Sequence, residues 1–133
     1  MNWAKVVGVG AVAGFVVSLV NYLLHGVIMG ATYEEYSEVF AQEQASPLKF
    51  IVVAIAIGIF FTILFAKTRD CWAAGAKGGM VYGFWLGMVA FFANFYDPLV
   101  IEGFPYYLAW CHGGIGLIGA VIGGAIAGLL IKR

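Results

Sequence analysis

The residues best suited to chemistry in this sequence are its two histidines, His25 and His112. Each lies inside a long apolar stretch, a few residues from one of its ends. Ionisable side chains are costly to bury in apolar surroundings, so they mark candidate functional sites. If the two stretches form neighbouring antiparallel helices, the imidazoles share one depth and can supply both axial ligands of a haem iron. The sequence therefore predicts haem b as a candidate cofactor, with His25 and His112 as its ligands.

The residues around the histidines are compatible with a flat porphyrin. Gly26 follows His25, and Gly113 and Gly114 follow His112, which leaves helix surface without side chains. The attachment motif of c-type haem, Cys-x-x-Cys-His, is absent. Apolar aromatic walls for the porphyrin are expected from Phe91, Phe92, Phe95 and Trp110.

Three other interpretations of the histidines stay open. Each imidazole can donate hydrogen bonds to the backbone or to loop residues, or it can contact a quinone. The third interpretation is a metal ion, but no metal site is predicted. A structural zinc site needs four ligands, and the neighbouring side chains of Cys111 and His112 point about 100° apart on a helix.

Other polar groups in the apolar stretches are few. Asn21 lies one helical turn before His25, and Asn94 lies near the end of another stretch. No Asp or Glu occurs within the stretches and no catalytic constellation is visible, so we do not expect an enzyme. The two asparagines can form hydrogen bonds between helices or line a route for an uncharged or anionic solute.

The elements that must position these residues are membrane-spanning helices. Hydrophobic residues make up 63% of the 133 residues and charged residues 11%, which is more apolar than a soluble domain of this size. Four stretches are close to the ~20 apolar residues that a spanning helix needs, at 6–29, 50–66, 78–95 and 107–131. The expected fold is all-α, a bundle of four transmembrane helices forming a single domain over residues 1–133.

The distribution of charge predicts the orientation. Six basic residues fall on one side of the four-span layout, and one, Lys49, falls on the other. Cytoplasmic loops are rich in Lys and Arg, so both termini are expected in the cytoplasm, with the protein in a bacterial inner membrane. The other side is acidic. The six basic residues are Lys5, Lys67, Arg69, Lys77, Lys132 and Arg133, and the acidic ones are Glu34, Glu35, Glu38, Glu43, Asp97 and Glu102.

This layout argues against a disulfide bond and against a nucleic-acid partner. Cys71 and Cys111 fall near opposite membrane surfaces, about 30 Å apart, which is too far for a disulfide. No basic stripe with interleaved aromatic residues occurs, so a nucleic-acid partner is not expected.

The two halves of the sequence resemble each other. The sequence VAGF at 12–15 corresponds to VYGF at 81–84, at an offset of 69 residues. Such a repeat predicts two tandem hairpins related by a pseudo-two-fold axis along the membrane normal. The outer segment 31–47 is expected to form an amphipathic helix on the membrane surface, with Tyr33, Tyr36 and Phe40 on its apolar side.

Glycines four residues apart recur in the third and fourth stretches. Small residues at this spacing let helix backbones approach closely in lipid. The fourth stretch has two such faces, enough for one neighbour inside the bundle and another outside it, so a homo-oligomer or a larger assembly is one prediction. Packing within one monomer is the alternative. The helix-packing residues are Gly79, Gly83, Gly87, Gly116, Gly119, Gly123, Gly124 and Gly128.

The third stretch, with the sequence KGGMVYGFWLG at 77–87, and the glycine-rich stretch after Trp110 carry a resemblance to a family. The layout resembles small four-span bacterial membrane proteins that are known as domains of unknown function. The resemblance covers most of the chain, and it implies a fold but no activity.

Three functions are predicted. The favoured one is a non-catalytic accessory subunit that packs through its glycine-rich helix faces in a larger membrane complex. The second is a haem-binding electron-transfer or assembly protein that uses His25 and His112. The third is a small oligomeric channel or carrier with Asn21 and Asn94 along its route.

Overall fold

The computed structural model describes residues 1–40 and 46–132, and this part of the chain is helical with no β-strand. The predicted all-α class is therefore confirmed. In chain order the elements are α1 (Trp3–Asn21), η1 (Tyr22–Ile28), α2 (Gly30–Glu35), α3 (Pro47–Lys67), η2 (Arg69–Cys71), α4 (Gly75–Ala93), η3 (Asn94–Tyr96), α5 (Asp97–Val100) and α6 (Tyr106–Leu130). The segment η1 is a π-helix, and η2 and η3 are 3₁₀-helices.

Four helical segments of the described chain are long and apolar enough to cross a membrane. They are Trp3–Ile28, Pro47–Lys67, Gly75–Val100 and Tyr106–Leu130. The second and third segments are longer than the apolar stretches seen in the sequence, because Pro47 begins α3 and the short helices η3 and α5 extend α4. The protein thus has the helices of a small multi-pass membrane protein.

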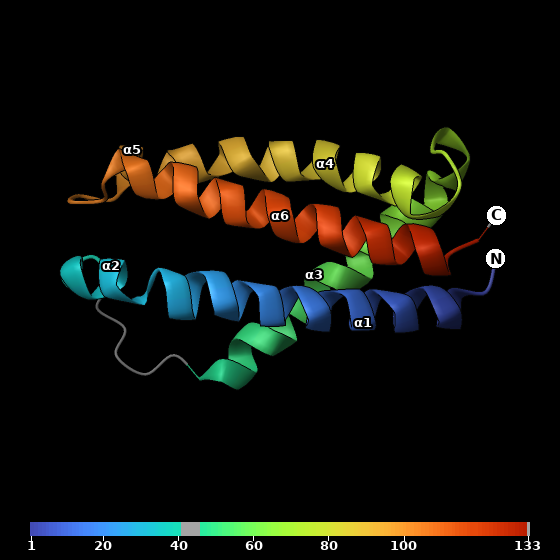
Figure 1. Ribbon diagram of the computed structural model, residues 1–133, viewed down its shortest axis with the longest axis horizontal. Helices are drawn as coiled ribbons and strands as arrows, with labels where there is room; N and C mark the ends of the chain where they lie inside the picture. Colours follow the sequence, from blue (N-terminus) through green and yellow to red (C-terminus); the bar gives the residue numbers. More distant parts are fainter. Residues whose placement is uncertain (41–45, 133) are drawn as a thin grey trace.

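The long helices pack in two pairs. Helix α1 packs along α3, α4 packs along α6, and contacts between α1 and α6 join the pairs. The N-terminal end of α1 and the C-terminal end of α6 lie at the same end of the bundle, and α2 and α5 lie at the opposite end (Figure 1). The predicted symmetry between two hairpins stays a prediction.

Glycines bring the paired helices into backbone contact. A Cβ atom added to Gly14 of α1 would lie 2.3 Å from the carbonyl oxygen of Ala54 in α3. A Cβ atom added to Gly83 of α4 would lie 2.1 Å from the carbonyl oxygen of Ala120 in α6. On the second face of α6, a Cβ at Gly119 would lie 3.0 Å from Val17 of α1. A Cβ at Gly116 would meet no atom within 4 Å. Both glycine faces of α6 therefore have neighbours inside the chain, with Gly116 as an open position.

Two polar contacts tie α3 and the following segment η2 to later parts of the chain, near the end of the bundle where the termini lie. The Tyr82 hydroxyl of α4 donates to the Phe61 carbonyl oxygen at 2.7 Å. The Arg69 Nε donates to the Ile131 carbonyl oxygen at 2.8 Å, and the Arg69 guanidinium lies over the Phe65 ring, 5.5 Å from its centre. Arg69 was expected on the cytoplasmic surface as an orienting charge, but its side chain is buried.

The segment after η1 differs from the predicted amphipathic helix over 31–47. Helix α2 ends at Glu35, turns follow it through Val39, and residues 41–45, with Glu43, lie outside the described residues, as does Arg133. Tyr33, Tyr36 and Phe40 do share one side, but they pack on the end of the bundle. Their partners there are Met29, Phe104, Leu108 and Ile115.

Candidate functional site

His25 lies in the π-helix η1, which continues α1 without a break. The wider winding is visible in the bond from the Met29 N–H to the Leu24 carbonyl oxygen, which spans five residues at 3.1 Å. Short π-helical segments are uncommon and often occur at functional sites. The different winding changes the direction in which His25 points, compared with a continuous α-helix.

Tyr33 of α2 lies between the two histidines. Its hydroxyl oxygen is 2.5 Å from Nδ1 of His25 and 2.8 Å from Nε2 of His112. The centres of the two imidazole rings are 5.2 Å apart, with an angle of 71° between their planes. The histidines of the sequence, 87 positions apart, thus meet at one shared hydroxyl group. We call these three residues the His–Tyr–His cluster.

His112 lies in the second turn of α6 and is enclosed by aromatic rings from two loops. The ring centre of Phe104 lies 5.8 Å from that of His112, and the ring centre of Phe40 lies 6.1 Å from it. Gly103 has φ +79, a backbone conformation that favours glycine, and Phe104 directly follows this turn. The turn at Gly103 therefore helps to bring the Phe104 ring onto the cluster.

The hydrogen bonds of the cluster form a short chain. When both imidazoles are neutral, one imidazole N–H donates to the phenol oxygen, and the phenol O–H donates to the other imidazole nitrogen. The cluster then has one free N–H and one free nitrogen lone pair, at its two outer ring nitrogens. Both histidines are half-buried, so the cluster is not sealed inside the bundle.

Tyr33 is a neutral phenol at ordinary pH. Burial, with a smaller contribution from the nearby Cys111, raises the pKa of Tyr33 to about 12. A hydroxyl that keeps its proton can both donate and accept, as its position between two imidazoles requires. The phenolate form is reached only at high pH or when a cation binds the oxygen.

The structure brings His25 and His112 together, but the aromatic residues predicted to form walls around a porphyrin do not lie beside them. Phe91, Phe95 and Trp110 pack against one another, with Phe92 beside them, where α4 and η3 lie along α6, and Phe92 and Trp110 are exposed. The rings around the histidines are those of Tyr33, Phe40 and Phe104. These residues lie in the segments between the spans, where helix periodicity gives no information about contacts.

The two asparagines do not form one polar route. The Asn94 Nδ2 donates to the Ala90 carbonyl oxygen one turn earlier, at 2.7 Å. Asn21 lies against α6, where a Cβ added to Gly119 would be 3.7 Å from the Asn21 Oδ1. Each asparagine has a local contact on a different part of the bundle, so the channel prediction gains no support here.

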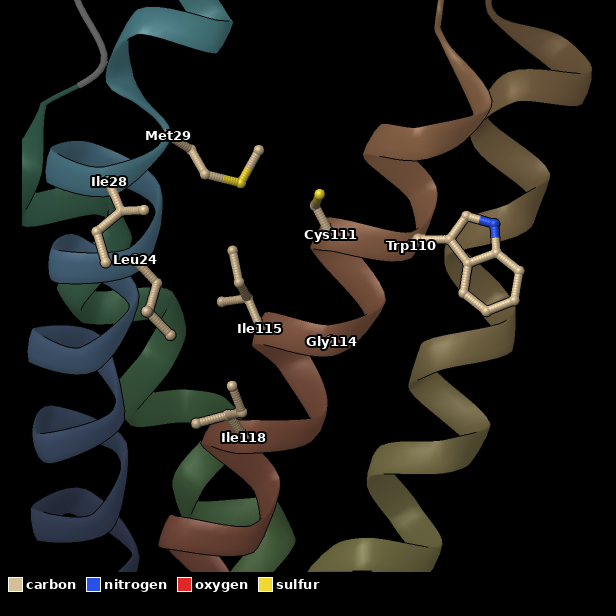
Figure 2. Close-up of a pocket in the computed structure, with 8 residues that line it drawn as sticks. All are labelled: Leu24, Ile28, Met29, Trp110, Cys111, Gly114, Ile115 and Ile118. Atoms are coloured by element: carbon tan, nitrogen blue, oxygen red, sulfur yellow. The ribbon is translucent and has the colours of Figure 1, made fainter.

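An apolar groove lies beside the cluster, between η1 and α6 (Figure 2). Its volume is about 270 Å³, and the sulfur atoms of Met29 and Cys111 point toward the end of the groove nearest α2. Neither histidine lines the groove, so it offers no support for a quinone head group bound by the imidazoles. The lining residues are Leu24, Ile28, Met29, Trp110, Cys111, Gly114, Ile115 and Ile118.

Within the described residues, no three side chains of the His, Cys, Asp and Glu types lie close enough to hold a metal ion together. His25 and His112 supply two nitrogen donors. A metal ion bound by these two nitrogens would need further ligands from a porphyrin, from solvent, or from a different residue type.

No protein-family model matches this chain, and the comparisons with curated proteins and with solved structures also find no match.

Proposed function

We propose that this small membrane protein binds a transition-metal centre through His25 and His112. The observation that carries the proposal is the meeting of the only two histidines of the chain at one hydroxyl group. Neutral imidazole is a common ligand of iron, copper and zinc. Haem iron and a bare metal ion share this chemistry, and a binding role needs no catalytic group from the protein.

The geometry supports a binding site in three ways. The two imidazoles come from separate elements, η1 and α6, and α2 joins them through Tyr33. Half-buried histidines leave an entry path for a ligand. Phe40 and Phe104 pack around His112 and restrict its orientation, as the surroundings of a metal ligand commonly do.

We place this site on the outer side of a bacterial inner membrane, with both termini in the cytoplasm. The support is the charge asymmetry of the sequence, since the basic residues concentrate near the end of the bundle where the chain begins and α6 ends. The cluster lies at the opposite end, next to α2.

The predicted role as an accessory subunit of a larger complex has weaker support. It depended on glycine faces that were free to pack against a partner. Gly79, Gly83, Gly124 and Gly128 have backbone neighbours within the chain, and Gly119 and Gly123 lie against side chains of α1 or α3. A partner helix would have to use other surfaces, such as the open position at Gly116.

The test is an absorption spectrum and a metal analysis of the protein extracted from its native membrane. A haem centre predicts a Soret band, and a bare ion predicts bound metal without one. Either centre is expected to be lost in His25→Ala and in His112→Ala, and kept in Asn94→Ala as a matched control. A wild-type protein that stays free of metal after incubation with haemin and with copper, iron and zinc salts contradicts the proposal.

A further inference from the structure

We infer that Tyr33 is the third protein ligand of this centre and that the centre is a single copper(II) ion, not a haem iron. The inference rests on the proposed function, since it keeps His25 and His112 as the nitrogen ligands. It adds the residue that completes the site and the chemical class of the metal.

The first argument is that three donor atoms already converge. The Tyr33 oxygen lies 2.5 Å from one ring nitrogen and 2.8 Å from the other. For metal–ligand bonds of about 2.05 Å, two donors at a right angle on one ion are about 2.9 Å apart. The Tyr33 oxygen therefore needs to separate from each nitrogen by only a few tenths of an ångström for the oxygen and that nitrogen to share one ion.

The second argument is the separation of the imidazole rings. Two imidazoles on opposite sides of a haem iron have ring centres about 6.4 Å apart for metal–nitrogen bonds of about 2.0–2.1 Å. The ring centres of His25 and His112 are 5.2 Å apart. At a bare ion with the same bond lengths, nitrogen–metal–nitrogen angles from 90° to the tetrahedral value place the two ring centres about 4.5–5.2 Å apart. The observed separation lies at the tetrahedral end of this range and is shorter than the haem value.

The third argument is the place of the Tyr33 oxygen beside both nitrogens. In a haem with two axial histidines, the positions beside the axial ligands belong to the porphyrin nitrogens. The Tyr33 hydroxyl occupies such a position, so haem requires Tyr33 to leave the cluster. A bare ion instead gains an oxygen ligand.

The donor set selects the metal. Two imidazole nitrogens and one phenolate oxygen form a mixed N,O donor set, of the kind that copper(II) binds readily. Copper(II) also binds such ligands more tightly than the other divalent first-row ions. When the Tyr33 oxygen binds the ion, its O–H bond breaks and the proton passes to water, while both imidazoles stay neutral. No oxidation or reduction takes place in this step.

The experiment is a titration of the full chain in detergent with copper(II), after removal of metals by a chelator. All variants carry Cys71→Ser and Cys111→Ser, which removes the two thiols of the chain that copper(II) could oxidise. The expected result is one ion per chain with a visible phenolate-to-copper charge-transfer band. Tyr33→Phe is expected to lose the band and bind copper at least about tenfold more weakly. Tyr36→Phe, which removes a phenolic hydroxyl three residues away, is expected to keep both the charge-transfer band and the copper affinity.

The other outcomes separate this inference from the proposed function. Copper that binds without the band, or with a band that persists in Tyr33→Phe, overturns the role of Tyr33. If His25→Ala and His112→Ala still abolish binding in that case, the proposed function stands. Stoichiometric haem in the native protein also overturns the inference while supporting the proposed function. A chain that binds zinc or iron but neither copper nor haem overturns the inference alone, and a chain that binds none of these overturns both.

Discussion

Gly79 of α4 and Gly124 of α6 face each other where the backbones of the two helices are in direct contact. A Cβ atom added to Gly79 would lie 1.9 Å from the Gly124 carbonyl oxygen, and one added to Gly124 would lie 2.1 Å from the Gly79 carbonyl oxygen. Only hydrogen atoms fit between these backbones. In lipid, such close approach provides van der Waals contact where no hydrophobic effect drives helices together.

We predict that Gly124→Leu destabilises the protein itself. The leucine side chain has to push α4 away from α6, and overpacking of this kind typically costs about 1–3 kcal/mol. Unfolding in mixed detergent micelles measures the effect. Gly116→Leu is the matched control, because a Cβ there meets nothing within 4 Å. Equal stability of the two variants would contradict the assignment of Gly124 to packing within the chain.

Tyr82→Phe tests the polar contact between α3 and α4. The Tyr82 side chain is 2% exposed, and its hydroxyl donates to the Phe61 carbonyl oxygen at 2.7 Å. Its loss is expected to cost about 0.5–1.5 kcal/mol, measured by the same unfolding assay. Tyr22→Phe serves as the control, since Tyr22 is 70% exposed. A Tyr82→Phe variant as stable as the control would show that this bond contributes nothing.

The two native cysteines test the orientation. Cys71 is exposed in η2, near the end of the bundle that we place in the cytoplasm. In a Cys111→Ala background, a membrane-impermeant maleimide is expected to label Cys71 in inverted vesicles and not in intact spheroplasts. Adding Glu102→Cys with Cys71→Ala should reverse the pattern, because Glu102 is exposed at the other end. Labelling of Cys71 in intact spheroplasts would show that this end of the bundle faces outward, which contradicts the proposed topology.

The titration of Tyr33 is expected to be shifted to high pH. Burial raises the pKa of Tyr33 to about 12 from its ordinary value of 10.0. Because the folded pKa lies above the unfolded one, the contribution of the neutral phenol to stability is complete below pH 10 and is lost as the pH rises toward 12. The difference in tyrosinate absorbance between wild type and Tyr33→Phe measures this titration. A midpoint near pH 10 would indicate that Tyr33 is solvated and outside the cluster.

The candidate site was only partly predictable from the sequence. His25 and His112 stand out because ionisable residues are rare in apolar stretches, and equal depth on antiparallel helices is simple helix geometry. Tyr33 also stood out, but as one of three aromatic residues on a predicted surface helix. Its contact with both imidazoles depends on the end of α1 being a π-helix and on α2 being short, and neither has a clear signal in the residue pattern. A tyrosine eight residues after a membrane histidine was the available signal.

The sequence by itself determined the four apolar helices, because hydrophobicity and helix length are local properties that the bilayer thickness converts directly into spans. It also indicated the glycines that allow close packing. Only the tertiary structure decided which helices those glycines join, which aromatic rings enclose the histidines, and that Tyr33 lies between them. Such contacts depend on helix rotation and on loop paths, where shifts of an ångström separate a hydrogen bond from no contact, and no local pattern in the chain encodes that precision.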